Sequence, residues 1–533
     1  MPMTAFDRRL ADLARIPRPE LSGRTGLAEV ALAKAAADPA RILVRDGARA
    51  VSRGEMVELA CRLGGALAAR GIAPGAAVAF QLPNWWEACV VNLAAALFGY
   101  RLVPLLTIYR QAELGFILPA LAVEAIVVPQ AWRGTDYPGL VARLPNPPAH
   151  VFTVRGDAAA DTSFEALLRH PAATPVPPPA TDAKMVLFTS GSTGRPKGVI
   201  HSHATVDAII RRTADFWGTG PDDGLYVPSP IGHIGGSIYA FEFPWLTDCT
   251  AILAEAWDPD AAVSAIDAAG ATFMAGATPF LAGLIAAAQR AGTRLPTLRR
   301  FVCGGASVPP ELVLRGLAHF PNAVVSRAYG STEVPLVCPG ACDRAQAQAH
   351  ADTDGEISVD LRIVDDAGSP VADGAAGEIL VRGPQMLLGY LDPDDDAAAM
   401  TADGFFRMGD LGRRVAGRYL EITGRKKDII IRKGENISPL EIENALARHP
   451  AVRQSAVVGI PDPERGEMVV AFVLPADGAS FTLDVMKAHL DGLGLARQKF
   501  PERLHVVEAL PVNAVGKVQK KDLRALAAAG GQA

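Results

Sequence analysis

The chain has 533 residues and a mass of 55.9 kDa, which is long for one hydrophobic core, so about two to four domains are expected. Its composition is 49% apolar and 20% charged. These values exclude an intrinsically disordered chain, a coiled coil and a small disulfide-stapled protein. With 52 basic and 57 acidic residues the formal net charge is −5, so no surplus of positive charge favours binding to nucleic acid.

The six cysteines are scattered, and only Cys338 and Cys342 lie close together in the sequence. One such pair without nearby histidines is not a zinc-site pattern, so free thiols in a reducing cytoplasm are expected. Residues 1–20 carry charges throughout and lack the apolar core of a signal peptide. The most apolar stretch, 88–106, is interrupted by polar and charged residues, and no stable membrane insertion is expected.

The first half of the chain alternates helix and strand patterns. Ser52 with Glu55 three residues later predicts a capped helix start, and Asn84 is expected to cap an apolar helix that ends at Gly99. Alternation of this kind predicts a mostly parallel sheet covered on both faces. The expected helices are 52–71, 84–99 and 111–122, and the expected strands are 77–82, 102–106 and 125–129.

The second half changes character. A proline-rich stretch, 171–180, predicts a surface connection, and after Gly377 the strands become shorter with Gly and Asp turns. The last ~100 residues hold enough short strands and helices for a small α+β domain. We therefore expect an α/β protein with a large N-terminal domain of layered sheets and helices and a smaller, mobile α+β C-terminal domain.

The sharpest local pattern is MVLFTSGSTGRPKGVI, residues 185–200. An apolar strand runs into a loop of glycines and hydroxyl side chains, and a second strand follows. Glycines let backbone N–H groups turn toward an anion, hydroxyls add donors, and a lysine adds positive charge. Pro196 before the lysine distinguishes the loop from a Walker loop, and the plain alternative is a flexible Gly/Ser connection. The expected phosphate-binding residues are Thr189, Ser190, Gly191, Ser192, Thr193, Gly194 and Lys197.

The segment TSGSTGRPKGV, residues 189–199, resembles the signature of the adenylate-forming superfamily of acyl-CoA synthetases, adenylation domains and luciferases. Further motifs follow in the superfamily's order between about Ser52 and Leu523. The resemblance implies that a carboxylate and ATP give an acyl-adenylate and pyrophosphate, after which a thiol attacks the adenylate. It also implies ATP, Mg²⁺ and coenzyme A as cofactors and substrates.

Two motifs resemble the superfamily's nucleotide-binding segments. CGGAS, residues 303–307, resembles the adenine-side loop, and YGSTE, residues 329–333, resembles the segment that holds adenine, the α-phosphate and the metal. A hard divalent cation needs few protein oxygens when phosphates supply the others. Alone, the tyrosine would be a core ring and the glutamate a solvated charge. The resemblance implies Gly305, Ala306, Tyr329, Gly330 and Thr332 as nucleotide-binding residues, Thr332 also as a catalytic residue, and Glu333 as the Mg²⁺ ligand.

A third motif, FRMGDL, residues 406–411, resembles the segment whose aspartate accepts both ribose hydroxyls. A carboxylate has two oxygens for that role, and charge-assisted hydrogen bonds are strong. By the same resemblance Asp410 and Arg425 are the ribose-binding residues. The alternative for Asp410 is a turn aspartate beside a strand.

Near the C-terminus, LPVNAVGK resembles the motif that ends in the catalytic lysine, here Lys517. A lysine on a loop can bridge the substrate carboxylate and the α-phosphate as charge develops. Asn513 stands where the superfamily usually has threonine. Lys427 falls at the superfamily's hinge and is expected to divide the domains at 1–426 and 427–533, although a surface lysine in a basic run is the alternative.

His233 matches a histidine at the mouth of the acyl pocket in acyl-CoA ligases, although a lone histidine is more often structural. Ile234 stands near the position of the aspartate that binds the substrate amine in amino-acid-activating relatives, which disfavours an amino acid. His201 and His203 lack a third metal ligand, and His203 is expected to begin a helix.

The expected function is ATP-dependent carboxylate–CoA ligation, an acid–thiol ligase reaction, in the cytoplasm. The expected substrates are a small carboxylic acid, ATP and coenzyme A, and a homodimer is left open. An apolar, neutral acyl pocket and segments similar to the branch with cyclohexanecarboxylate–CoA ligases predict an alicyclic, medium-chain or simple aromatic monocarboxylic acid. The alternatives are an enzyme that loads a carrier protein and a non-catalytic nucleotide-binding module.

Overall fold

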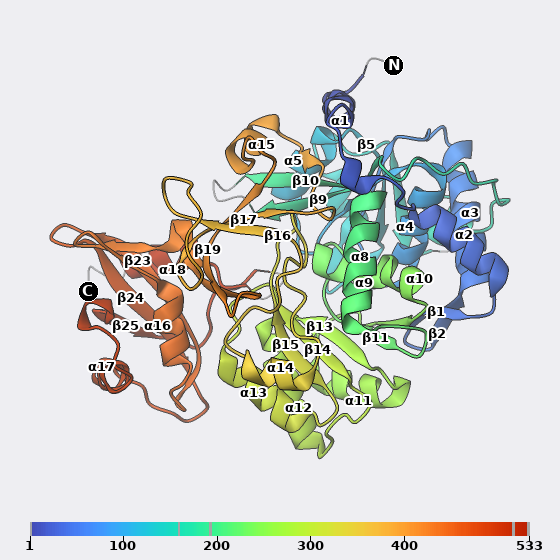
Figure 1. The fold of residues 1–533 in the computed structure, drawn as a ribbon. Helices are drawn as coiled ribbons and strands as arrows, with labels where there is room; N and C mark the ends of the chain where they lie inside the picture. Colours follow the sequence, from blue (N-terminus) through green and yellow to red (C-terminus); the bar gives the residue numbers. More distant parts are fainter. Residues whose placement is uncertain (1–2, 158–159, 191–194, 514–516, 530–533) are drawn as a thin grey trace.

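The structure is a computed structural model that describes residues 3–157, 160–190, 195–513 and 517–529 (Figure 1). The described residues form two seven-stranded sheets, a four-stranded sheet and a five-stranded sheet, with a short two-stranded ribbon, β6–β7, beside them. The α/β class and the division into a large N-terminal part and a smaller C-terminal part are confirmed.

The first large sheet carries the strands on either side of the glycine-rich loop. Its inner pairs β9/β4, β4/β3, β3/β5 and β5/β8 are parallel, while β10 returns antiparallel to β9. The strands in sheet order are β18 (Gly389–Tyr390), β10 (Pro196–Ser202), β9 (Ala183–Ser190), β4 (Arg101–Pro104), β3 (Ala77–Phe80), β5 (Val123–Pro129) and β8 (His150–Val154). The strands expected at 77–82, 102–106 and 125–129 are therefore present with small changes at their ends.

The second large sheet is parallel except at its β1–β2 edge. Its order is β15 (Val324–Ala328), β14 (Arg300–Gly304), β13 (Phe273–Gly276), β11 (Gly224–Val227), β12 (Thr250–Leu253), β1 (Ile42–Asp46) and β2 (Arg49–Ser52). Loops after parallel strands gather at one edge of a sheet, which is where ligands bind in such folds.

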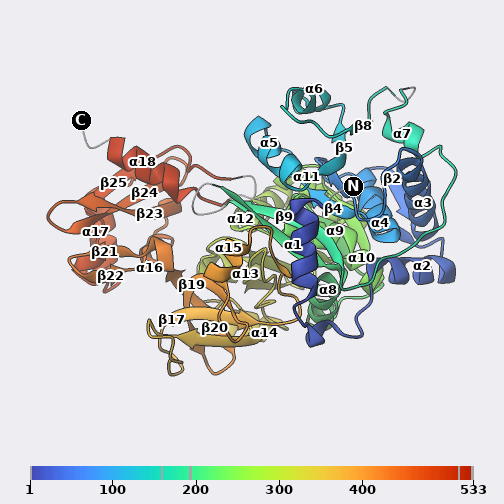
Figure 2. The same ribbon diagram turned by 90° about the horizontal axis from the view of Figure 1, so that it is seen from above.

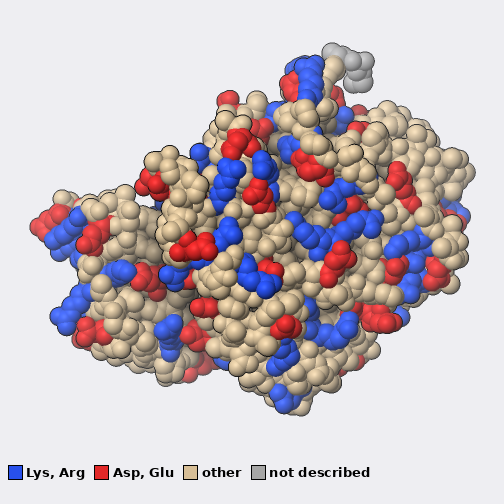
Figure 3. Space-filling view, viewed as in Figure 1, with Lys and Arg blue, Asp and Glu red and all other residues tan. Residues whose placement is uncertain are grey.

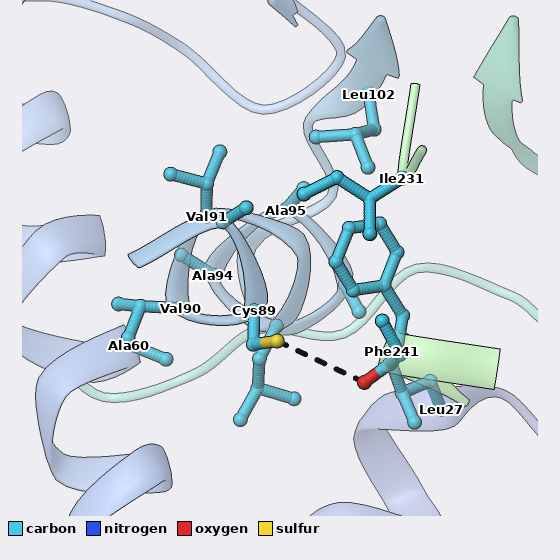
Figure 4. Close-up of a cluster of buried hydrophobic side chains, with 14 of the residues drawn as sticks. Leu27, Ala60, Cys89, Val90, Val91, Ala94, Ala95, Leu102, Ile231 and Phe241 are labelled. Atoms are coloured by element: carbon cyan, nitrogen blue, oxygen red, sulfur yellow. Dashed lines mark hydrogen bonds between the residues drawn. The ribbon is translucent and has the colours of Figure 1, made fainter. Parts of the chain in front are cut away.

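Helices fill the space between the two large sheets. One hydrophobic cluster contains residues from both sheets and from seven helices, so the two layers share a core. In Figure 4 the α4 side chains around Cys89 face Phe241 and Ile231, and the Cys89 thiol donates to the Ala240 carbonyl over 3.7 Å. The helices of this layer are α3 (Arg53–Ala69), α4 (Trp86–Phe98), α8 (His203–Trp217), α9 (Ile234–Phe241) and α10 (Phe243–Thr247).

Other helices cover the outer faces of the sheets. The first sheet is covered by α1 (Ala5–Ala14), α5 (Gln111–Ala120) and α6 (Tyr137–Ala142), and the second by α11 (Pro259–Ala269), α12 (Thr278–Ala291), α13 (Pro310–His319) and α14 (Arg344–Ala349). Helices α2 (Leu27–Ala37) and α7 (Phe164–Leu167) also contribute buried residues to the core between the two large sheets. Helix α15 (Pro393–Ala399) lies at the periphery (Figures 1 and 2).

The C-terminal part begins after the four-stranded antiparallel sheet, whose last strand ends at Arg425. That sheet has the order β16 (Asp360–Val364), β17 (Gly377–Arg382), β19 (Phe406–Val415) and β20 (Tyr419–Arg425). A 3₁₀ turn at Lys426–Asp428 leads to the five-stranded sheet of β21 (Ile430–Arg432), β22 (Glu435–Ile437), β23 (Val452–Asp462), β24 (Gly466–Pro475) and β25 (Arg503–Val506). Helices α16 (Pro439–Leu446), α17 (Leu483–Gly492) and α18 (Lys520–Ala529) pack beside it, and Figure 2 shows this unit to one side of the rest.

Three helix-start predictions have different outcomes. Ser52 does cap α3, since its hydroxyl accepts from the Glu55 N–H. The prediction for Asn84 is wrong, because Trp85 is the N-cap residue of α4 and the buried Asn84 amide bonds elsewhere. His203 begins α8 as expected, and Ser202 caps that helix.

Within the described residues no helix is both long and apolar enough to cross a membrane. On the face shown in Figure 3, basic and acidic side chains are interspersed. All six cysteines are free, and only Cys342 is exposed.

Candidate active site

The strands that flank the glycine-rich loop place Thr189 opposite Lys197 in the β9–β10 ladder, with Pro196 opposite Ser190. The backbone of Ser190 closes β9. The predictions for Gly191, Ser192, Thr193 and Gly194 lie outside the described residues. The two ends of the loop are thus fixed by strand pairing.

The sequence predicted Lys197 only as a phosphate ligand, but the structure also pairs it with a carboxylate and a tyrosine ring. Its Nζ lies 2.7 Å from Asp395 Oδ1, at the start of α15, and 5.2 Å from the centre of the Tyr390 ring. Tyr390 belongs to β18, which pairs with β10. The lysine therefore lies between the loop strand and the segment that leads into α15.

Glu333 lies on the loop after β15 and accepts a hydrogen bond from the Tyr390 hydroxyl over 2.8 Å. Burial and the neighbouring carboxylate raise the pKa of Tyr390 well above its usual value, so it remains a donor. A carboxylate has about four lone-pair positions, so this one bond leaves room for a hard cation. The donor set around Glu333 therefore fits a Mg²⁺ ligand that shares its ion with phosphate oxygens.

The backbone at Thr332 is held by a histidine. His201 Nε2 lies 2.8 Å from the Thr332 carbonyl oxygen, and its Nδ1 lies 3.1 Å from Thr205 Oγ1. Burial lowers the pKa of His201 to about 4, so it stays neutral at physiological pH. Sequence reasoning considered His201 only as a metal ligand and missed this supporting role, because its partner is far away in the chain.

Two neighbouring strand ends bring the adenine-side motifs together. Gly304 at the end of β14 pairs with Ala328 of β15, so Gly305 and Ala306 lie beside Tyr329 and Gly330. A Cβ on Gly304 would lie 2.6 Å from the Ala328 carbonyl oxygen, so the close approach requires glycine there. The two loops are therefore adjacent at the carboxyl edge of the second sheet.

Asp410 joins this edge to the four-stranded sheet. Its Oδ2 accepts from the Tyr329 hydroxyl over 2.7 Å, and its Oδ1 accepts from Arg425 Nε over 2.8 Å. Asp410 and Arg425 are direct partners in the β19–β20 ladder. Burial, followed by the Asp410 charge, raises the pKa of Tyr329 well above its usual value. Asp410 thus contacts both the predicted adenine-binding tyrosine and the second predicted ribose-binding residue, Arg425.

Lys517 is a half-buried residue on the loop before α18. The Asn513 side-chain oxygen accepts from the Lys517 N–H over 2.9 Å, and the Asn513 N–H donates back to the Lys517 carbonyl over 2.9 Å. Burial first and the Arg425 charge second lower the pKa of Lys517 to about 8. The asparagine therefore closes the loop where the superfamily usually has threonine.

His233 lies near enough to Lys517 to feel its charge: burial first, and Lys517 second, lower the pKa of His233 to about 4. The imidazole caps α9, because its Nδ1 accepts from the Gly235 N–H over 3.2 Å. Lys427, in the 3₁₀ turn between sheets, also has a lowered pKa, through burial first and Arg425 second. The Lys517 charge thus acts on the start of α9, and the Arg425 charge acts on both Lys427 and Lys517.

The loop before His233 is held by the buried Asn84. Its Nδ2 donates to the Val227 and Ser229 carbonyls over 3.0 and 2.9 Å, and its Oδ1 accepts from the Ile231 N–H over 3.0 Å. Gly236 approaches the Pro230 carbonyl so closely that a Cβ would lie 2.3 Å from it. The start of α9 is therefore a tightly built backbone segment.

From the sequence, residues 230–239 and 277–279 are expected to contribute to the acyl pocket. They include most of α9 and the start of α12, where Thr278 Oγ1 donates to the Ser307 carbonyl over 2.7 Å. Phe280 stacks on Trp257 with ring centres 4.5 Å apart. Residues 230–239 and 277–279 contain no lysine, arginine, aspartate or glutamate. Charged acyl groups would find no fixed counter-charge in these segments.

Two family models match this chain. Residues 32–391 match the family described as AMP-binding enzyme, and residues 441–517 match the AMP-binding enzyme C-terminal domain. Two curated relatives are the medium-chain fatty-acid–CoA ligase of Escherichia coli and the indoleacetate–CoA ligase of Aromatoleum aromaticum. The first relative is 34% identical in sequence, and the match covers 86% of this chain and 82% of the relative. The second is 32% identical, and the match covers 92% of this chain and 96% of the relative.

A similar fold occurs in the crystal structure of ATP-bound MatB from Rhodopseudomonas palustris. The TM-score is 0.84 with 29% sequence identity, over 94% of this chain and 99% of that one.

Proposed function

We propose, from the premise that this chain belongs to the AMP-binding enzyme family, that it is an ATP-dependent carboxylate–CoA ligase. It joins an acid to ATP as an acyl-adenylate and then transfers the acyl group to coenzyme A. The observation that carries this proposal is the chain of contacts from Tyr329 through Asp410 to Arg425, whose charge acts on Lys517. Side chains that could hold a nucleoside are thereby linked to a lysine that could stabilise the negative charge that develops on the phosphate.

In the first half-reaction a carboxylate oxygen of the acid attacks the α-phosphorus of ATP, and pyrophosphate leaves. Asp410 has remaining lone pairs for the ribose hydroxyls, and Arg425 keeps its carboxylate oriented. Lys517 supplies positive charge between the carboxylate and the α-phosphate, and Thr332 contacts the same phosphate.

Glu333 would hold Mg²⁺, which supplies charge neutralisation for the phosphate oxygens. Tyr390 keeps the Glu333 carboxylate oriented, and Lys197 adds positive charge on the phosphate side. The loop 190–194 is assigned to phosphate binding from its sequence alone. The nucleotide-binding set thus comprises Thr189 to Gly194, Lys197, Gly305, Ala306, Tyr329, Gly330, Thr332, Asp410 and Arg425.

In the second half-reaction the thiol of coenzyme A attacks the acyl carbonyl carbon, and AMP leaves with the electrons of the broken C–O bond. The family uses rotation of a small domain between the two steps, and we assign domains 1–426 and 427–533 with the hinge at Lys427. The 3₁₀ turn at Lys426–Asp428 between two separate sheets supports this assignment.

The acid is an apolar monocarboxylic acid, either alicyclic, medium-chain or simple aromatic. Two features of the sequence support this assignment. Residues 230–239, around His233, contain no lysine, arginine, aspartate or glutamate, and position 234 holds isoleucine in place of a carboxylate that could bind a substrate amine. Acetate would leave such a slot mostly unfilled, losing about 0.8 kcal/mol per absent buried CH₂. A cytoplasmic enzyme is proposed, and a homodimer is the assembly to test by light scattering.

The test is a screen of acid-dependent pyrophosphate release with the full chain. Cyclohexanecarboxylate and hexanoate are expected to give a higher kcat/KM than acetate, an amino acid or a dicarboxylate. A reversed order would contradict the acid assignment. Pyrophosphate release without any thioester when coenzyme A is supplied would favour loading of a carrier protein, and no release with any acid would favour a non-catalytic module.

A further inference from the structure

Both described cations at the end of the glycine-rich loop are paired with carboxylates from one distant segment. Arg195 forms an ion pair with Asp392, and Lys197 lies 2.7 Å from Asp395. The acidic segment leads into α15 and follows β18. Basic groups placed for polyphosphate are thus already matched with negative charge.

The segment that carries Asp395 is anchored independently of Lys197. Arg9 of α1 donates to the Tyr390 carbonyl over 2.8 Å and pairs with Asp396, whose Oδ1 accepts from the Tyr390 N–H over 2.8 Å. The Leu391 N–H donates to the Gly198 carbonyl over 2.7 Å. Because backbone and side-chain bonds fix this base, the flexible part of the pair is the Lys197 stem.

The pair is only partly screened by water, with 25% of the Lys197 side chain and 22% of the Asp395 side chain exposed. An ammonium in contact with a carboxylate presents little net charge to a third ion. A polyphosphate must therefore draw Lys197 from Asp395 or share it, and the carboxylate itself repels the anion.

We propose that Asp395 competes with pyrophosphate for Lys197 and thereby sets how tightly the enzyme holds this product. Asp395 touches no reacting atom in this assignment and acts through Lys197. The inference rests on the proposed function for the identity of the anion. Its consequence is weaker pyrophosphate binding and faster product release than an unpaired lysine would give.

The test measures the Kd of pyrophosphate for the full chain by titration calorimetry, which needs no turnover. Asp395→Asn is expected to lower this Kd about three- to fivefold, the upper part of the range for ion pairs near the surface. Asp394→Asn is the matched control, because it removes the same charge from an exposed neighbour in the same helical turn. Asp395→Glu keeps a carboxylate and is expected to remain near the wild type.

A double-mutant cycle isolates the lysine. In a Lys197→Met background, Asp395→Asn is expected to change the Kd no more than Asp394→Asn does. A higher Kd in Asp395→Asn would show instead that the carboxylate only positions the lysine, and equal changes in Asp395→Asn and Asp394→Asn would show a general charge effect. Either result, or no pyrophosphate binding by the wild type, overturns the inference. If the Kd values follow this cycle but the chain releases no pyrophosphate with any acid, the ligase function is contradicted and the role of Asp395 is not.

Discussion

The buried surroundings of Lys517 disfavour its charge, and we propose that the first half-reaction depends on this residue. Lys517→Ala is expected to reduce acyl-adenylate formation by about 10²–10³-fold, the scale for one preorganised electrostatic donor. Thioester formation from supplied acyl-adenylate is expected to survive, because the small domain is proposed to turn between the steps. Rapid-quench assays of each half-reaction measure this, and an equal loss in both would refute the assignment.

The pH dependence of adenylation provides a second check on the same residue. Since the pKa of Lys517 is lowered to about 8, its ammonium is charged below that pH and becomes neutral above it. The kcat/KM for adenylation is therefore expected to fall as pH rises through about 8. In Lys517→Arg the guanidinium stays charged, so kcat/KM for adenylation should not fall as pH rises through about 8, even if the variant is slower at every pH. A wild-type profile that stays flat to pH 10 would contradict a role for the Lys517 charge.

At the scale of elements, the start of α9 depends on a side chain from the loop before α4. Asn84→Ala would remove the acceptor of the buried Ile231 N–H and a donor from the Ser229 carbonyl, and an unsatisfied buried group costs about 1–3 kcal/mol. The Val227 carbonyl would keep its bond from the Ala254 N–H. We expect a lower free energy of unfolding in urea and a raised KM for the acid. Asn322→Ala, at an exposed asparagine, is the control. Equal losses in the two variants would contradict the role of Asn84.

Asn84 also illustrates how far sequence reasoning reaches. An asparagine before an apolar helix is a capping pattern, yet its partners lie on β11 and the loop that follows it, far away in the chain. The same holds for His201 with the Thr332 carbonyl and for Lys197 with Asp395. Periodicity and motif order predicted the strands around the loop and the α/β class, because those depend on local pattern. Long-range polar pairs depend on packing, which no local pattern encodes.

At the scale of the whole molecule, the small domain contacts the large one through groups that can separate. Arg448 of the C-terminal part pairs with Glu311 of α13 over 3.2 Å, and both side chains are largely exposed. Such surface pairs contribute about 0.2–1 kcal/mol. Ser438, before α16, also donates to the Thr423 carbonyl of β20. Rotation about the 3₁₀ turn at Lys426–Asp428 would therefore separate the surface pair and rearrange the contact between Ser438 and Thr423.

Lys427→Pro tests that rotation, because proline fixes φ and would favour one of the two domain positions. The rates of adenylation and of thioester formation are expected to fall unequally. Lys433→Ala is the control for loss of a nearby positive charge. A uniform fall in both rates with an unchanged circular dichroism spectrum would argue against a hinge at this residue.

The most direct measurement of the central claim is product stoichiometry with the wild-type chain, Mg²⁺, ATP, coenzyme A and cyclohexanecarboxylate or hexanoate. Mass spectrometry and nucleotide chromatography are expected to find acyl-CoA, AMP and pyrophosphate in equal amounts, with an acyl-adenylate when coenzyme A is omitted. ADP and inorganic phosphate as products, or acyl-CoA formed without AMP, would contradict ligation through an acyl-adenylate.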